Sequence, residues 1–455
     1  TNIIFTQMPD YSYVESHKEY MDLLGIMACR QESVDIEELH IFNDFFVSKE
    51  RLYSNKDFYG DKGKFKLEIP YYELRTGYQV FAQGKVKDVK YLEYPPLLWR
   101  TYTDKGYVFV VNTDLFEGKS LLGVLTAFVS QCDTYDVYPV VNAQTVSVIN
   151  FPVLKNENEE MFEETYDRDM YSFSRDILWP GVSAILQNYN KSYNFFMAPK
   201  LDYSKEDMTD NPDIAYYYSE IITKLGTLGV SYDQVSEEPL ETIKETLDKA
   251  VSESVDSYVQ TAAYVPKDKL EDTDSIISES TNIIVTDMSE DLPVFEKTDN
   301  GYMRVSFTSS GLRHDMQEDL SLISMETALG LDMQSTNMMD VLFKNDDTYW
   351  EKVSSKWASE KTYLNDFVKF DTISVEESMV RFSNFLMLDY KAERLPDGNL
   401  NIHITSGNNK GYFIIRLWNE KITKVSSGSF EQINDTTYLV SVVDKDTVIY
   451  TKNRK

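Results

Sequence analysis

The sequence has few cysteines and no long apolar run. Its 455 residues include two cysteines, Cys29 and Cys132, so a single disulfide in an exported protein and two separate thiols are equally allowed. No stretch reaches the roughly 18 consecutive apolar residues that a transmembrane helix needs, and no signal peptide is recognisable. Because the first residue is Thr and not Met, we expect that a leader or membrane anchor has been removed and that the protein is extracellular or at the cell surface.

Positive charge is also scarce. The sequence has 45 Lys and Arg against 75 Asp and Glu, which gives a net charge of −30. Such a chain repels phosphate backbones and anionic membranes, and nucleic acid is therefore set aside as a partner. The charge suits a cationic partner such as an amino sugar polymer, although solubility alone explains it more simply. Aromatic residues, in contrast, are abundant, with 32 Tyr and 24 Phe, and such rings serve as core or as platforms for sugars.

Hydrophobic periodicity predicts an α/β protein of three domains. Residues 107–112 (YVFVVN) are typical of a buried strand, and the TDKG turn at 103–106 joins this strand to another in a hairpin. A hairpin that feeds a helix resembles flavodoxin-like and glutamine-amidotransferase-like folds, so we expect residues 1–144 to form an N-terminal α/β domain, with a further helix at 45–53. Alternating strands and helices predict a β/α barrel in residues 145–392, and closely spaced strands predict a β-sandwich in residues 393–455.

Several segments of the barrel region together carry a family resemblance. They are the strand that ends in Asn150-Phe151-Pro152, the strand YNFFMA, the stretch LGTLGVS, and the later GLDMQSTNMMD and ISVEESMVRFSNF. This set resembles the NodB-like polysaccharide deacetylase superfamily, and more closely a bacterial branch that is encoded with exopolysaccharide gene clusters, including Pel-type clusters. The resemblance implies a deacetylase-like barrel between an α/β domain and a β-sandwich, and it implies polysaccharide or exopolysaccharide synthesis proteins as partners.

The resemblance further implies a divalent metal held by one Asp and two His, with a second Asp as the general base. The superfamily has a paired Asp-Asp after the first barrel strand, where this chain has the neutral Asn150. The paired His should follow the third strand, but no His lies between His40 and His314, and all four His are isolated. We therefore predict no metal and no cofactor, with Zn²⁺ expected only if this assignment of the motifs is wrong.

Few residues remain to carry chemistry. In the related branch a His-rich segment precedes an Asp, whereas this chain has Gln334 and Asn337 there and retains only Asp340. The candidate catalytic residues are His314, Asp315 and Asp340. His314 and Asp315 follow a predicted barrel strand, although a local ion pair is the simpler interpretation of these two. The groove that holds the active site in the superfamily is predicted to bind substrate here through Asn150, Trp179, Gln334 and Asn337. Trp350 and Trp357, seven positions apart, are predicted to form a buried stripe on a helix.

Three hypotheses follow for the function. The first is a deacetylase-like pseudoenzyme that binds an exopolysaccharide or a synthesis partner. The second is an active carbohydrate hydrolase with a non-standard site, either a deacetylase or a glycosidase that uses two carboxylates. The third is a structural subunit that docks other proteins through its outer domains.

Overall fold

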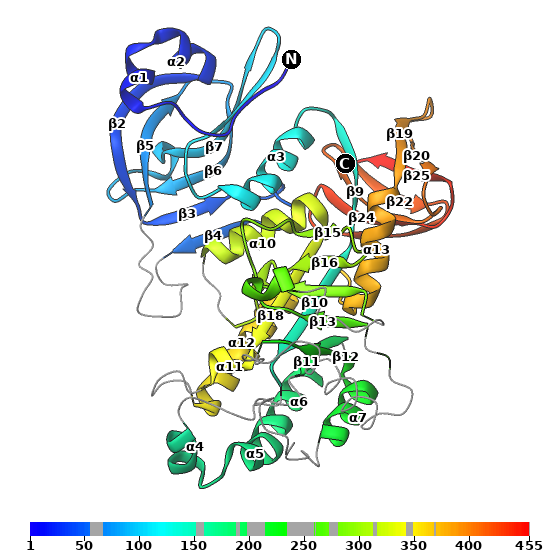
Figure 1. Cartoon of the computed structure of the whole chain (residues 1–455). Coiled ribbons are helices and arrows are strands. Elements are labelled where there is room, and N and C mark those ends of the chain that lie inside the picture. The colour runs from blue at the N-terminus through cyan, green and yellow to red at the C-terminus, as the bar shows by residue number, and fades with distance from the viewer. Residues whose placement is uncertain are drawn as a thin grey trace. The chain divides into compact units, whose positions relative to one another are not determined.

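The computed structural model describes residues 1–54, 67–151, 159–187, 192–197, 214–233, 259, 261–272, 281–312, 316–342, 349–367 and 370–454. The described chain divides into two compact units, which are visible in Figure 1. The first unit contains residues 1–141, 314–330 and 384–455, and the second contains residues 142–313 and 331–383. The two ends of the chain therefore belong to one unit, whereas the sequence predicted separate terminal domains.

The N-terminal part of the first unit is built on a six-stranded sheet with the order β1-β8-β7-β6-β3-β4. Its strands are β1 (Ile3–Phe5), β3 (Glu38–Ile41), β4 (Arg51–Ser54), β6 (Gln79–Lys85), β7 (Pro96–Thr103) and β8 (Gly106–Val111). The predicted hairpin is confirmed, with Thr103 opposite Gly106. Of the described pairings in this sheet, β1 with β8 is parallel and the others are antiparallel. The expected flavodoxin- or amidotransferase-like arrangement is therefore wrong, because those sheets are mostly parallel.

The first unit also contains α1 (Tyr11–Ser16), α2 (Lys18–Leu24), the paired strands β2 (Ile26–Ile36) and β5 (Leu67–Leu74), α3 (Leu121–Ser130) and, from later in the chain, α10 (Met316–Leu329). The helix predicted at 45–53 is wrong. Phe45, Phe46 and Val47 are three consecutive buried residues, a pattern that lacks the one-sided period of a surface helix. Asp44, just before them, has a φ of 65° and turns the chain. Both cysteines are free thiols in the structure.

Two four-stranded antiparallel sheets complete the first unit and share one apolar core. Their strands are β9 (Tyr135–Val140), β19 (Asp389–Arg394), β20 (Leu400–Ser406), β21 (Gly411–Leu417), β22 (Glu420–Val425), β23 (Gly428–Gln432), β24 (Thr437–Val442) and β25 (Asp446–Asn453). β9 pairs with β21, so the N-terminal region contributes a strand to this sandwich. The buried Arg416 donates to the carbonyl of Phe45 at 2.7 Å, and Thr436 donates to Asp44 at 3.0 Å. These bonds hold the sandwich and the N-terminal region in one unit.

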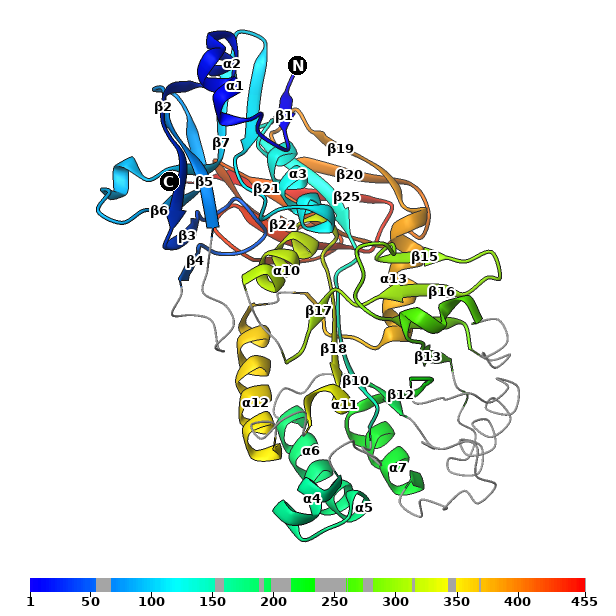
Figure 2. The ribbon, with the colours of Figure 1, turned by 60° about the vertical axis from the view of Figure 1, so that its left-hand side comes forward.

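The second unit contains a curled nine-stranded sheet with the order β15-β16-β14-β13-β12-β11-β10-β18-β17, which forms a half-barrel. Its strands are β10 (Ala143–Ile149), β11 (Tyr193–Met197), β12 (Gly226–Ser231), β13 (Ala262–Tyr264), β14 (Ile283–Thr286), β15 (Phe295–Lys297), β16 (Met303–Ser306), β17 (Ser309–Ser310) and β18 (Leu331–Asn337). The described neighbours are parallel except β15 with β16. Figure 2 shows β10 and β18 running side by side through this unit.

Several helices accompany this sheet. They are α4 (Glu159–Tyr166), α5 (Met170–Phe173), α6 (Trp179–Gln187), α7 (Ile214–Lys224), α11 (Met338–Val341), α12 (Trp350–Phe367) and α13 (Val375–Met387). Trp350 and Trp357 of α12 are buried in the core, which confirms the predicted stripe. Gly181 of α6 allows this packing, because a Cβ there would lie 2.5 Å from the Trp350 ring. Among the described helices, none is long and apolar enough to span a membrane.

Candidate functional site

Polar side chains meet where three parallel strands of the second unit end. Asn150 directly follows β10, Ser231 is the last residue of β12, and Asn337 is the last residue of β18. Asp233 lies two residues beyond Ser231. Because β10 is parallel to β18 and, through β11, to β12, these ends lie at one edge of the sheet. In open α/β sheets this carboxyl edge is where ligands bind.

Hydrogen bonds join the four side chains, which we call the amide cluster (Asn150, Ser231, Asp233 and Asn337). The Asn150 amide nitrogen donates both to Asp233 Oδ2 and, at 2.9 Å, to Asn337 Oδ1. The Ser231 hydroxyl donates to Asn150 Oδ1 at 2.6 Å. The Asn337 amide nitrogen reaches Asp233 Oδ2 at 3.4 Å. The cluster therefore cross-links the ends of β10, β12 and β18.

The backbone explains why Asn occupies two of these positions. Asn150 has a φ of 57°, a left-handed conformation that Asn adopts more readily than most residues. Its own N–H donates to the Phe196 carbonyl at 2.8 Å and so extends the ladder to β11. Asn337 caps α11, because its Oδ1 accepts the N–H of Met339 at 3.1 Å. Both amides are thus placed by the turns that end their strands.

Asp233 is the one member of the cluster with a side-chain oxygen that accepts no hydrogen bond from the described residues. Its Oδ2 accepts the two amides, whereas no donor among the described residues reaches its Oδ1. Asn150 and Ser231 are each about 1% exposed, while Asp233 is only partly buried. The neighbouring Lys269 directs its ammonium to the backbone carbonyls of Tyr232 and Asp233, at 3.2 and 2.7 Å. A ligand at this edge would therefore meet a carboxylate oxygen in front of a fixed amide network.

The residues of the amide cluster do not fit the metal that the resemblance implies. A catalytic Zn²⁺ site uses about three protein ligands, usually His, Asp or Glu. Asn150 Oδ1 already accepts from Ser231, and Asn337 Oδ1 accepts from Asn150 and Met339. Asp233 Oδ1 is the one oxygen of the cluster that accepts no hydrogen bond from the described residues. Among the described residues, no group of three or more His, Cys, Asp or Glu side chains could hold a metal ion.

Gln334 was predicted to line the same groove as Asn337, but the structure separates the two. They are three positions apart on β18, and alternate residues of a strand point to opposite faces. Gln334 is buried and accepts a hydrogen bond from Lys361 of α12 at 3.1 Å. It also donates to the fully buried Asp332. Gln334 thus belongs to a polar network inside the unit and not to the carboxyl edge.

That internal network centres on Asp332. Its carboxylate accepts from Ser309 at 2.6 Å, from Thr308 at 3.3 Å and from Gln144 at 3.4 Å. Burial raises the pKa of Asp332, while the hydrogen bonds from Ser309, Gln334 and Gln144 and the charge of Lys361 act in the opposite direction. The network joins β10, β17, β18 and α12, so its role is to hold the sheet together beneath the site.

Trp179 was predicted to bind substrate, but it lies in the hydrophobic core and is 4% exposed. Its ring packs within 6.4 Å, centroid to centroid, of Phe151, Phe195 and Tyr217. A ring enclosed by other rings offers no face to a sugar, and this prediction is therefore corrected. His314 and Asp315 lie outside the described residues. Asp340 lies in α11, and its side chain is likewise outside what the structure describes.

Sequence reasoning missed Asp233, which sits in the stretch SYDQ with no recognisable motif around it. One positional signal could have found it. Asp233 directly follows a predicted strand, and in parallel sheets the residues just after strand ends form the site. The structure thus brings together Asn150 and Asn337 from the prediction with Ser231 and Asp233, and it excludes Trp179 and Gln334 from the group.

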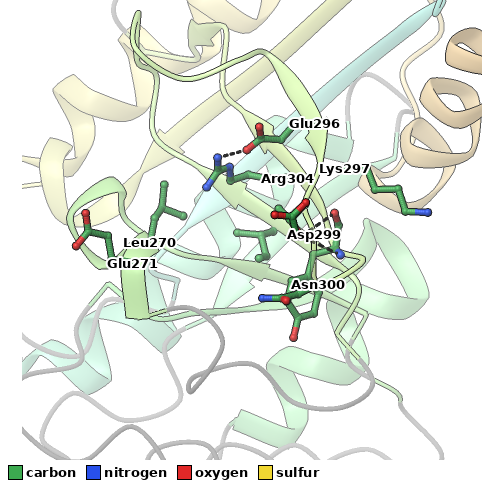
Figure 3. A pocket seen from close by; sticks show the side chains of 10 residues that line it. Leu270, Glu271, Glu296, Lys297, Asp299, Asn300 and Arg304 are labelled. Carbon is green, nitrogen blue, oxygen red and sulfur yellow. Dashed lines mark hydrogen bonds and ion pairs between the residues drawn. The ribbon is translucent and has the colours of Figure 1, made fainter.

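A separate hollow of about 370 Å³ lies beside the β15–β16 hairpin (Figure 3). Its carboxylates are Glu271, Glu296 and Asp299, and its cations are Lys297 and Arg304. Glu296 and Arg304 form a cross-strand ion pair. The hairpin turn that forms part of this hollow directly precedes β16, at the edge opposite the amide cluster. None of the residues that line this hollow belongs to the amide cluster.

Comparison with solved structures supports the fold. The chain is similar to Agd3, described as a novel carbohydrate deacetylase, with a TM-score of 0.52, 10% sequence identity, and coverage of 98% of this chain and 87% of that one. This likeness shows a carbohydrate deacetylase-like fold and no more, since one fold supports many activities. A candidate glycoside hydrolase/deacetylase from Parabacteroides distasonis aligns with a TM-score of 0.31 and 11% identity, over 62% of this chain and 82% of that one.

Comparison by sequence identifies a protein family, but it identifies no individual curated relative. No curated protein matches the chain. One family model matches residues 2–230, just over half of the chain. This span includes β10, β11 and most of β12, and with them Asn150. The chain belongs to the family described as an uncharacterised protein conserved in bacteria (DUF2194).

Proposed function

We propose that this protein binds a polysaccharide at the carboxyl edge of its deacetylase-like sheet and does not de-N-acetylate it. The observation that carries the proposal is the amide cluster, whose oxygens are satisfied internally except for Asp233 Oδ1. The carbohydrate deacetylase-like fold supports a saccharide ligand. In line with the sequence resemblance, we propose an exopolysaccharide as the ligand, outside the cell or at its surface, with synthesis proteins as further partners.

Hydrolysis of an acetamide in this superfamily depends on a metal that activates water and polarises the carbonyl. In this chain, hydrogen bonds between Asn150, Asp233 and Asn337 connect the strand ends that a metal would otherwise join. Asn150 is neutral and cannot accept a proton as a general base. The cluster can instead orient a sugar, since carboxylate and amide groups accept from and donate to hydroxyl groups.

A second candidate function is a carboxylate-based hydrolase, which the free Oδ1 of Asp233 favours because a carboxylate can activate water. Glycosidases of this kind need a second carboxyl group across the scissile bond. Release of reducing ends from a polysaccharide, unaffected by EDTA and lost in Asp233→Asn, would support this candidate. Binding without any product would exclude it for the polymer tested.

The proposal is tested by affinity electrophoresis in gels that contain soluble polymers of N-acetylglucosamine, N-acetylgalactosamine, glucosamine or glucose. We expect retardation by at least one of the amino sugar polymers, and the same retardation in the presence of EDTA. Asn337→Ala removes an acceptor of the cluster and should weaken binding by about fivefold or more, the worth of roughly one hydrogen bond.

The matched control is Asn408→Ala, which removes an exposed amide of the first unit that bonds to Asn384. This variant should bind like the wild type. The proposal is wrong if none of the polymers retards the protein, or if EDTA abolishes the retardation.

A further inference from the structure

We propose that the amide cluster recognises the free amine of a de-N-acetylated amino sugar in preference to the N-acetylated form. This inference rests on the proposed function and adds the chemical class of the ligand. It follows from a count of the donors and acceptors that the cluster has left, and from the charges that surround Asp233.

The cluster has spare acceptor capacity and few spare donors. An Asn amide nitrogen carries two hydrogens, and Asn150 uses both, toward Asp233 and Asn337. The Ser231 hydroxyl hydrogen is used on Asn150. Asn337 retains one N–H, because its amide nitrogen makes a single bond, to Asp233. Asp233 Oδ1, in contrast, accepts nothing from the described residues.

The nearby charges leave this carboxylate without a described cationic partner. Lys269 brings a cation to this edge, but its ammonium is bonded to the carbonyls of Tyr232 and Asp233 and not to the carboxylate. The next carboxylate along the edge, Asp287, already accepts from the Tyr264 hydroxyl at 2.6 Å and from the Lys267 N–H at 2.9 Å. Of these two described carboxylates, Asp233 is therefore the one with an oxygen that accepts no described hydrogen bond.

An ammonium group matches this arrangement better than an acetamide does. An ammonium has three donors and a positive charge, and hydrogen bonds between charged groups are roughly twice as strong as neutral ones. An acetamide needs a donor for its carbonyl, and the cluster offers only the remaining N–H of Asn337. Among the described residues, no group of three or more His, Cys, Asp or Glu side chains could hold a metal ion that would bind the acetyl oxygen.

The test measures the affinity of the full chain by isothermal titration calorimetry for β-linked oligomers of glucosamine and of N-acetylglucosamine of equal length. Polylysine serves as a polycation that is not a sugar. We expect tighter binding of the glucosamine oligomer, and Asp233→Asn should weaken it by about tenfold or more while changing the affinity for the acetylated oligomer little. Asp291→Asn, which removes the same charge at a position 83% exposed, should leave both affinities unchanged.

Equal or tighter binding of the acetylated oligomer overturns the inference and leaves the proposed polysaccharide binding intact. Equally tight binding of polylysine, or equal losses in Asp233→Asn and Asp291→Asn, also overturns the inference, because nonspecific charge would then explain the preference. If neither oligomer binds, the inference fails for this polymer, and the electrophoresis with the other polymers decides the proposed function separately. Circular dichroism of each variant establishes that a loss of binding reflects the site and not unfolding.

Discussion

Trp179→Ala is expected to lower the free energy of unfolding by about 3–5 kcal/mol, the usual cost of removing a large aromatic side chain from a core. Trp179 is 4% exposed and lies among Phe151, Phe195 and Tyr217, so its removal leaves a cavity that rigid neighbours cannot fill. Urea unfolding followed by circular dichroism measures the change. The polysaccharide affinity of the folded variant should match that of the wild type.

Trp418→Ala is the matched control, because Trp418 is only partly buried and lies in the first unit. The same change of residue there should cost much less stability. The opposite pattern for Trp179, unchanged stability with lost polysaccharide binding, would contradict its placement in the core and restore the sequence-based prediction of a sugar platform.

Asp332→Ala is expected to lower the free energy of unfolding by about 3–5 kcal/mol, because it leaves several buried donors without an acceptor. Asp332 is fully buried and accepts from Ser309, Thr308 and Gln144, as well as from Gln334. Asp332→Asn keeps the shape and one acceptor oxygen, and it should therefore cost less. Urea unfolding again gives both values.

The buried Asp332 also predicts that the free energy of unfolding depends on pH. Burial raises the pKa of Asp332 in the folded protein above its ordinary value, which is about 3.9 in the unfolded chain. The folded state then holds the proton more tightly than the unfolded state does. The contribution of Asp332 to stability is largest below about pH 4 and falls as the pH rises toward the raised pKa. The stability difference between wild type and Asp332→Asn should shrink over this interval, and a difference that grows with pH would contradict the assignment.

The sequence predicted the more apolar strands of the second unit and of the sandwich, because their apolar runs are short and bounded by turn residues. It did not predict β18, β19 or β23 as strands. It could not predict which elements pack together. β9 is close in sequence to the N-terminal strands, yet it pairs with β21 near the end of the chain. Such pairings depend on tertiary contacts that no local pattern records. The flavodoxin- or amidotransferase-like fold expected for the N-terminal region does not match its mostly antiparallel sheet, since an apolar run does not reveal the direction of its neighbour.

The candidate site was predictable in part. Asn150 and Asn337 were found because they stand where the resemblance expects metal ligands, and the structure joins them at 2.9 Å. Gln334 was grouped with Asn337 on position alone, although the two-residue period of a strand puts residues three apart on opposite faces. Asp233 was missed because no motif surrounds it. Trp179 was selected for its chemistry, and its burial among other rings appears only in the fold.

The proposed absence of deacetylase activity is tested by measuring acetate release. The wild-type chain is incubated with polymers of N-acetylglucosamine and of N-acetylgalactosamine, with and without added Zn²⁺, Co²⁺ or Ni²⁺. The amide cluster predicts no acetate above the level of a sample without protein, under any of these metals, while the same preparation still binds an amino sugar polymer. Robust metal-dependent acetate release would contradict the account, and His314 would then be the first residue to replace.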